Sequence, residues 1–142
     1  MDVFRLLLFI ILFSISLCSF GQCKSFTQKQ CMPKLLPFIH NGQMNNIELA
    51  PGQTASFQQT FYSGQNYKAL VCTENTLSGS YFEVFTVDNK LVYTNKSDLN
   101  EEWEFSVGST QNLLFKVFIP EAENEEDNNQ IGCVSVVIGF ED

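Results

Sequence analysis

The chain from Asn46 onward is a series of short runs in which apolar and polar residues alternate, and turn residues separate the runs. In the run 54–61, Ala55, Phe57 and Phe61 fall on one face, and the opposite face is polar. Successive side chains of a β-strand point to opposite faces, so this period of two predicts strands with one buried and one wet face. Dense turns without a helical period predict an all-β sandwich or barrel. We expect eight strands, over 47–49, 54–61, 67–72, 81–87, 91–94, 102–107, 113–119 and 131–140.

The segment before these strands has a different character. Ser25 can cap a short helix that runs to Cys31, and Pro33 and Pro37 then break regular structure. We therefore expect residues 32–44 to form an extended arm laid over the sandwich. Four apolar residues are expected to anchor this arm to the core, with an exposed docking strip as the alternative; they are Leu35, Leu36, Phe38 and Ile39.

Residues 1–21 carry the three parts of a cleavable secretory signal peptide. Arg5 supplies the charged start, residues 6–13 are all apolar, and Ser19-Phe20-Gly21 has the small-x-small pattern of a cleavage site. Cleavage after Gly21 makes Gln22 the mature N-terminus. We therefore expect an exported protein that is periplasmic, at the cell surface or secreted.

Two other interpretations of the apolar start remain open. Residues 3–20 are about long enough to cross a bilayer as an uncleaved anchor. A lipoprotein signal needs a small residue before its cysteine, whereas Leu17 precedes Cys18 and Gln22 precedes Cys23. No second apolar run of that length follows, so we expect no membrane span in the mature chain. The expected organisation is a signal peptide (1–21), an N-terminal arm (22–45) and one β-sandwich domain (46–142).

Four cysteines follow the predicted signal peptide: Cys23, Cys31, Cys72 and Cys133. In an oxidising compartment an even number of cysteines in a small domain predicts disulfides. Three pairings are possible, and local closure favours Cys23 with Cys31, which leaves Cys72 with Cys133. A zinc site is disfavoured because zinc ligands come in closely spaced pairs.

The chain is acidic, with a formal net charge of −8. Its lysines are scattered singly, so they form no basic stripe that could neutralise phosphates. Nucleic acid is therefore not an expected partner. A mature chain of about 120 residues can build one hydrophobic core, which predicts a single domain.

The sequence contains no pattern typical of a catalytic site. His40 is the only histidine, and no serine lies in the glycine pattern of a nucleophile elbow. Glu102 and Glu104 could serve as the paired carboxylates of a glycosidase, since they share one strand face. That face lies opposite Trp103 and Phe105, so both carboxylates should point to water. We therefore do not expect an enzyme.

Residues 121–129 form an acidic run with five carboxylates. The run lacks the Asp-x-Asp-x-Asp-Gly order of a calcium loop, and repulsion between like charges keeps such a segment extended. We expect no cofactor and no metal, with calcium bound at this run as the alternative.

Sugar recognition requires exposed aromatic rings on a sheet face or at a loop edge. Tyr62 and Tyr81 flank turns and are the candidate binding residues. Trp103 shares strand parity with Phe105 and is expected to be buried. Asn95-Lys96-Ser97 matches the N-glycosylation acceptor pattern, and we expect this match to be a chance occurrence.

Three stretches resemble the bacterial pre-peptidase C-terminal domain: LAPGQTASF at 49–57, YSGQNYKALVC at 62–72 and VDNKLVY at 87–93. The resemblance covers residues 46–140. It implies an antiparallel, jelly-roll-like β-sandwich of the kind appended to secreted enzymes, with an accessory role that is not catalytic.

These observations predict a non-catalytic, exported β-sandwich that binds a protein or a glycan at the cell envelope or outside the cell. The alternative is a disulfide-stabilised structural or inhibitory module. Such a module would dock on an exported enzyme through its N-terminal arm, residues 32–44.

Overall fold

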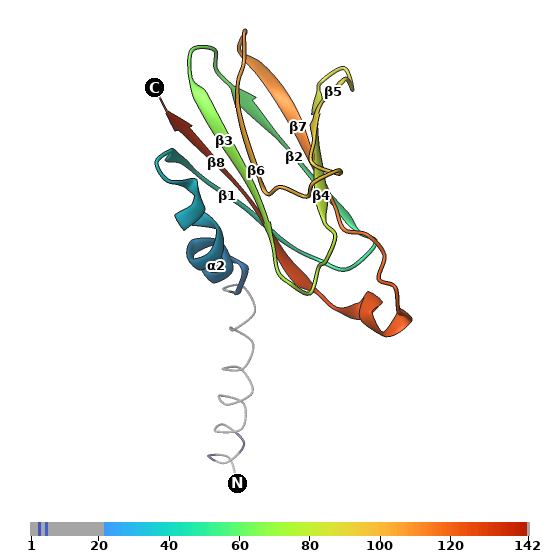
Figure 1. The fold of residues 1–142 in the computed structure, drawn as a ribbon. Coiled ribbons are helices and arrows are strands. Elements are labelled where there is room, and N and C mark those ends of the chain that lie inside the picture. Colours follow the sequence, from blue (N-terminus) through green and yellow to red (C-terminus); the bar gives the residue numbers. More distant parts are fainter. Residues whose placement is uncertain (1–2, 4, 6–21, 142) are drawn as a thin grey trace.

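Two four-stranded antiparallel sheets pack face to face (Figure 1). The structure, a computed structural model, describes residues 3, 5 and 22–141, so the predicted signal peptide lies outside it except for Val3 and Arg5. Sheet A has the strand order β1-β8-β3-β6 and sheet B the order β2-β7-β4-β5, which is the order of a jelly roll. The expected eight-stranded, antiparallel, jelly-roll-like sandwich is confirmed. The strands are β1 (Ile39–Leu49), β2 (Thr54–Phe61), β3 (Asn66–Thr73), β4 (Tyr81–Thr86), β5 (Leu91–Thr94), β6 (Glu102–Ser106), β7 (Gln111–Phe118) and β8 (Gly132–Glu141).

The first strand is much longer than the sequence pattern indicated. Residues 39–44, expected as part of an extended arm outside the sheets, belong to β1 and pair with the end of β8. The pairing register shifts between His40 and Met44, and Gly42 adopts a φ of 87° within this bulge. β1 is an edge strand of sheet A, and it forms because its backbone pairs with β8; the side chains of residues 39–44 do not alternate between apolar and polar. The prediction of an arm over these residues was therefore wrong.

The core lies between the two sheets. Phe61, Phe82 and Phe115 are completely buried there, and each stands at an inward position of its strand. Strand β8 is buried on both faces, as its continuous apolar sequence predicted. Its inner face meets sheet B, and the N-terminal helix covers its outer face.

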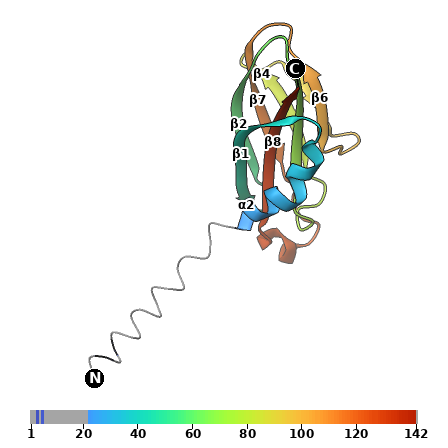
Figure 2. The ribbon, with the colours of Figure 1, turned by 90° about the vertical axis from the view of Figure 1, so that its left-hand side faces the viewer.

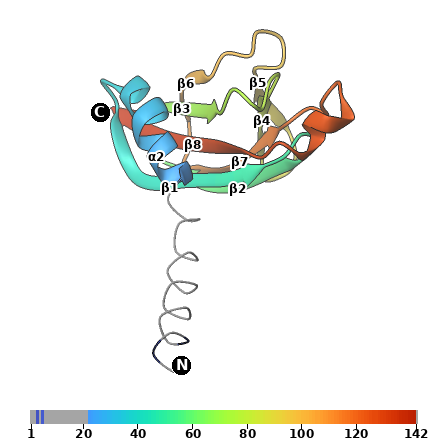
Figure 3. The same cartoon turned by 90° about the horizontal axis from the view of Figure 1, so that it is seen from below.

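The N-terminal helix spans residues 22–35. It consists of α2 (Gln22–Phe26), a π-helical turn (Thr27–Cys31) and a 3-10 turn (Met32–Leu35), and it contacts β1, β3 and β8 of sheet A. Figures 2 and 3 show how the helix lies against this sheet. Ser25 sits inside the helix rather than capping it. None of the described helices is long and apolar enough to cross a membrane.

The four predicted anchor residues divide into two pairs. Leu35 and Phe38 are buried, and they pack with Leu70 and Val137 in a second apolar cluster between the helix and sheet A. The other two anchors point away from the protein, with 73% of Leu36 and 61% of Ile39 exposed. Core contact is therefore confirmed for Leu35 and Phe38 and wrong for Leu36 and Ile39, for which the docking strip stays the alternative.

The two ends of the sandwich differ in their loops. One end, which we call the four-loop end, carries loops 50–53, 74–80, 95–101 and 119–131. The opposite end carries the loops 62–65, 87–90 and 107–110. Because every connection in this topology joins one end of a strand to the same end of the next, segments far apart in sequence meet at the four-loop end.

Candidate functional site

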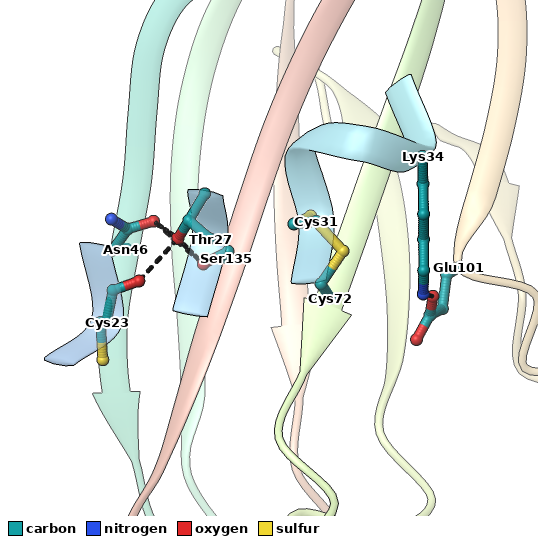
Figure 4. The surroundings of a disulfide bond; sticks show 8 residues. All are labelled: Cys23, Thr27, Cys31, Lys34, Asn46, Cys72, Glu101 and Ser135. Atoms are coloured by element: carbon teal, nitrogen blue, oxygen red, sulfur yellow. Dashed lines mark hydrogen bonds and ion pairs between the residues drawn. A yellow bond between two sulfur atoms is a disulfide. The ribbon is translucent and has the colours of Figure 1, made fainter. Parts of the chain in front are cut away.

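Two disulfides fix the N-terminal helix to sheet A. Cys23 is bonded to Cys133, and Cys31 is bonded to Cys72. The pairing expected from local closure, Cys23 with Cys31, was therefore wrong. Cys23 and Cys31 lie in the helix, whereas Cys133 belongs to β8 and Cys72 to β3. Figure 4 shows the bond between Cys31 and Cys72. Each bond consequently joins helix to sheet, and neither closes a loop within the helix.

A buried polar cluster lies beside the helix (Figure 4). The Thr27 hydroxyl lies 2.8 Å from the Cys23 carbonyl oxygen and 2.7 Å from Asn46 Oδ1. Ser135 in β8 donates to the same Asn46 oxygen at 3.0 Å and also contacts Thr27 directly. Thr27 and Ser135 are both completely buried. The cluster satisfies these polar groups within the protein, so it fixes the position of the helix and is not open to a ligand.

Three adjoining hollows surround the four-loop end. The loop hollow, about 480 Å³, lies between loops 74–80 and 119–131 and has Leu77 and Ile119 among its lining residues. The tyrosine hollow, about 260 Å³, extends from the same Leu77 to Tyr81. The helix hollow, about 320 Å³, continues to Lys34 of the N-terminal helix. Asn75 lines all three hollows, which therefore adjoin one another around loop 74–80; we call the three together the concave surface.

This concave surface is acidic. The loop hollow carries the carboxylates of Glu121, Glu123 and Asp127, and the other two hollows share Glu74 and Glu101. Lys34 is the only basic residue among the described residues that line these hollows, and its Nζ lies 2.5 Å from Glu101 Oε2. Its positive charge is therefore already matched by Glu101. A partner at this surface meets a negative potential focused by concave walls.

The loops of this end are fastened to one another. The N–H of Gly52 donates to the Ile119 carbonyl at 2.9 Å, and the Ile119 N–H donates to the Gln53 carbonyl at 3.0 Å. The N–H of Glu74 donates to the Cys133 carbonyl at 3.0 Å, which ties loop 74–80 to β8. The surface is thus held in shape before any partner arrives, which reduces the entropy lost on binding.

Glycine permits the close packing of loop 74–80 against β8. A Cβ at Gly132 would lie 2.7 Å from Thr76 Oγ1 and 2.8 Å from Leu77 Cγ, distances that real Cβ atoms do not show. Gly79 has a φ of 74°, a conformation that other residues rarely adopt. The loop that separates two of the hollows therefore depends on these two glycines.

The two candidate aromatic residues lie at opposite ends of the sandwich. Tyr81 begins β4 at the four-loop end, where it lines the tyrosine hollow and stacks on Phe118 with ring centroids 4.9 Å apart. Tyr62 follows β2 at the other end and is 58% exposed. The structure therefore does not bring them together into one site.

The other catalytic candidates from the sequence, His40, Glu102 and Glu104, contact groups within the protein. His40 Nε2 lies 2.9 Å from the Gln43 carbonyl oxygen within the β1 bulge. Glu102 and Glu104 are partly exposed, and they flank the ammonium group of Lys68, at 3.7 Å and 3.1 Å. Lys68 itself is buried, with its Nζ 5.0 Å from the centre of the Phe38 ring. These carboxylates therefore pair with a lysine that lies against Phe38. Alternation along β6 predicted the face of both glutamates but not this partner, because Lys68 belongs to the neighbouring strand β3.

The one group of possible metal ligands found among residues 22–141 is Cys23, Glu48 and Cys133. Both of its sulfur atoms belong to a disulfide, so they cannot act as thiolate ligands. The acidic run contains a short 3-10 helix (Glu125–Asn129) and lines the loop hollow. Calcium at this run stays the alternative to the expectation of no metal.

Two ionisable side chains at the β4–β5 hairpin have shifted pKa values. The Thr86 hydroxyl donates to Asp88 Oδ1 at 2.6 Å, and this bond, with a backbone hydrogen bond, lowers the pKa of Asp88. Burial raises the pKa of Tyr93, and the negative charge of Asp98 adds to the effect. Asp88 lies in the hairpin turn, where Asn89 has a φ of 64°, so turn geometry accounts for its contacts.

Sequence reasoning noted the acidic run, and it placed residues 74–80 between two predicted strands. It missed that they form one surface, because nothing in either segment indicates that β3 pairs with β8 and β4 with β7, which brings the β3–β4 and β7–β8 loops together. Only the strand order places them together. The exposed loop glycines, Gly52 and Gly79, were the available signals of a closely packed end, since each adopts a positive φ.

No protein-family model matches the sequence, and no curated protein matches it. The pre-peptidase C-terminal resemblance therefore stays a prediction. Among solved structures, the chain is similar to the crystal structure of Aeromonas hydrophila PliG, a periplasmic lysozyme inhibitor of g-type lysozyme. The TM-score is 0.50 at 12% sequence identity, over 70% of this chain and 85% of PliG. This disulfide-bonded jelly roll thus shares its fold with PliG.

Proposed function

We propose that this protein is exported, has no catalytic activity of its own, and binds and inhibits an exported hydrolase of the lysozyme class through its four-loop end. The acidic concave surface is the observation that carries the proposal. Five carboxylates line it, its loops are tied together by backbone hydrogen bonds, and its lysine is matched by Glu101. Such a surface is complementary to a basic protein, because opposite potentials raise the association rate and exclude acidic partners.

The fold supports the inhibitory form of this proposal. PliG, which shares the fold, is an inhibitor of g-type lysozyme, and an inhibitor needs only a rigid surface and no reactive residues. The two disulfides support export, because such bonds persist in oxidising compartments. N-terminal sequencing of the exported protein should then begin at Gln22. A start at Met1 in the exported fraction would contradict the signal-peptide prediction.

Docking through residues 32–44 is the competing route. The exposed Leu36 and Ile39 are the observation that favours it. Deleting residues 22–45 cannot test this route, because they contain two disulfide cysteines and much of β1. The double variant Leu36→Ser/Ile39→Ser removes the exposed apolar surface and leaves both disulfides in place.

The deciding experiment measures binding to g-type and c-type lysozymes, and the inhibition of their cell-wall lysis, for two charge-reversed variants. Glu121→Lys/Glu123→Lys changes two carboxylates that line the loop hollow. Glu125→Lys/Glu126→Lys makes the same charge change in the same loop, at exposed residues outside the hollow. We expect the first variant to lose inhibition and the second to keep most of it. Equal inhibition by both variants, or loss only in the Leu36/Ile39 variant, would reject the four-loop end as the site.

A further inference from the structure

The outer face of sheet B differs from that of sheet A because it is not covered by the N-terminal helix, which packs on sheet A. Strand register places three rows of side chains on this face. Each row joins one outward-facing residue of β2, β7 and β4 in turn. We call these residues the sheet B platform; the rows are Thr54-Phe118-Tyr81, Ser56-Lys116-Glu83 and Gln58-Leu114-Phe85.

The platform combines rings with hydrogen-bonding groups. Tyr81 and Phe118 stack with their rings nearly parallel, at an interplanar angle of 13°. Phe85 lies four residues further along β4, about 13 Å away at the rise of a β-strand. The residues of β2 beside these rings are hydroxyl and amide side chains that are exposed to solvent. Flat apolar rings next to a row of polar groups match the two kinds of surface that a sugar ring presents, its C–H face and its hydroxyl edge.

Two lysines give this face a local positive charge. Lys96 Nζ lies 5.1 Å from the centre of the Tyr81 ring, and Lys116 Nζ lies 4.9 Å from the centre of the Phe85 ring. Within residues 22–141, neither ammonium group has a carboxylate oxygen within 4.0 Å, whereas Lys34 and Lys68 are both paired. Glu83 is the one carboxylate within the three rows, in register with Lys116. Two unpaired cations therefore meet aromatic rings on one face of a chain whose net charge is −8.

We propose that the sheet B platform binds a glycan that carries carboxylate groups. Sugar rings pack against the partly exposed Tyr81-Phe118 pair and Phe85, and hydroxyls bond to the polar side chains of β2. The two lysines, which lie over the Tyr81 and Phe85 rings in the free protein, turn from these rings to the carboxylates. The span between the two aromatic positions requires an oligosaccharide rather than a single sugar. The site goes beyond hydrolase inhibition, and it would keep the protein on an acidic polysaccharide.

The test is calorimetric titration of the folded, oxidised protein with galacturonic acid oligomers, and with neutral glucose oligomers of the same length. We expect binding to the acidic oligomer that weakens as salt is added, because the contacts are exposed to solvent. Lys96→Gln/Lys116→Gln should bind roughly tenfold more weakly. Lys24→Gln/Lys29→Gln, the same charge change on the exposed surface of the helix, should bind like the unsubstituted protein.

Two further variants separate the rings from the charge. Phe118→Ala should weaken binding, with circular dichroism confirming that the sandwich is intact, and Glu83→Gln should tighten binding because it removes the repelling carboxylate. The proposal is overturned if the acidic oligomer does not bind, if neutral oligomers bind equally well, or if the two lysine variants behave alike. Since no hydrolase is present in the titration, failure of the inhibitor proposal leaves this result interpretable.

Discussion

Asn95 closes its loop through a buried hydrogen bond with the backbone of Phe82. The Phe82 N–H donates to Asn95 Oδ1 at 2.7 Å, and Asn95 Nδ2 donates to the Asn100 carbonyl at 2.8 Å. Only 3% of Asn95 is exposed. One side-chain amide therefore fastens loop 95–101 to the start of β4, and the amide nitrogen of the Asn95-Lys96-Ser97 pattern is enclosed in the folded chain.

Replacing Asn95 should destabilise the protein even though no core side chain is lost. Asn95→Ala leaves a buried N–H and a carbonyl without partners, which costs about 1–3 kcal/mol. Urea unfolding of the oxidised protein measures the change. Ser97→Ala is the matched control, because it destroys the glycosylation pattern without touching these bonds. Equal stability of the two variants would show that the Asn95 contacts contribute nothing.

The disulfide pairing makes a second prediction. The bonds join residues 110 and 41 positions apart, so in the chain-entropy model they stabilise the fold by about 5 and about 4 kcal/mol. Cys23→Ser/Cys133→Ser and Cys31→Ser/Cys72→Ser should each lower the free energy of unfolding by several kcal/mol. Peptide mapping without reduction checks the pairing itself. A peptide pair that links Cys23 to Cys31 would contradict the structure.

The sequence predicted the bounds of two strands correctly where turn residues flank them. Strands β2 and β5 have the predicted bounds, since turn residues stand at both ends of each. Most of β1 escaped prediction because its residues 39–46 include few apolar side chains, and an edge position in sheet A is all that makes them a strand. Alternation of apolar and polar residues cannot predict a strand that forms because its backbone pairs with a neighbouring strand.

The candidate site could not be predicted for a related reason. The disulfides join the N-terminal helix to strands, as Cys23 is joined to Cys133. The hollows join loops that the jelly-roll order of strands brings together, such as those of Ser78 and Glu121. Local closure was the wrong criterion for the cysteines because the whole N-terminal helix lies flat on the sheet, and each of its cysteines faces a strand. The distance between two cysteines along the sequence does not predict which strand each of them faces.

Tyr93 predicts a loss of stability at alkaline pH. Burial raises the pKa of this phenol above its ordinary value, so the folded protein holds the proton more tightly than the unfolded chain. The resulting stabilisation is complete below about pH 10, the ordinary tyrosine value, and is lost as the pH rises through the higher value of the folded state. Thermal melting between pH 8 and pH 11 should show a smaller alkaline decline for Tyr93→Phe. The exposed Tyr62→Phe variant should keep the decline of the unsubstituted protein.

Two glycines on β8 allow a direct comparison of the two docking routes. A Cβ at Gly132 would press on Thr76 and Leu77 of loop 74–80, whereas a Cβ at Gly139 would press on Leu35 and Phe38 of segment 32–44, in both cases at less than 3.0 Å. Each overpacked variant, Gly132→Ala and Gly139→Ala, should lose about 1–3 kcal/mol of stability. The two substitutions are chemically identical but displace opposite regions of the protein.

Inhibition measured with these two variants separates the routes. If the four-loop end binds the hydrolase, Gly132→Ala shifts the loop between two hollows and weakens inhibition, while Gly139→Ala leaves it nearly unchanged. Urea unfolding of both variants must show comparable destabilisation, so that loss of folded protein does not mimic loss of binding. The reverse outcome, inhibition weakened only by Gly139→Ala, would move the binding surface to the arm around Leu36 and Ile39.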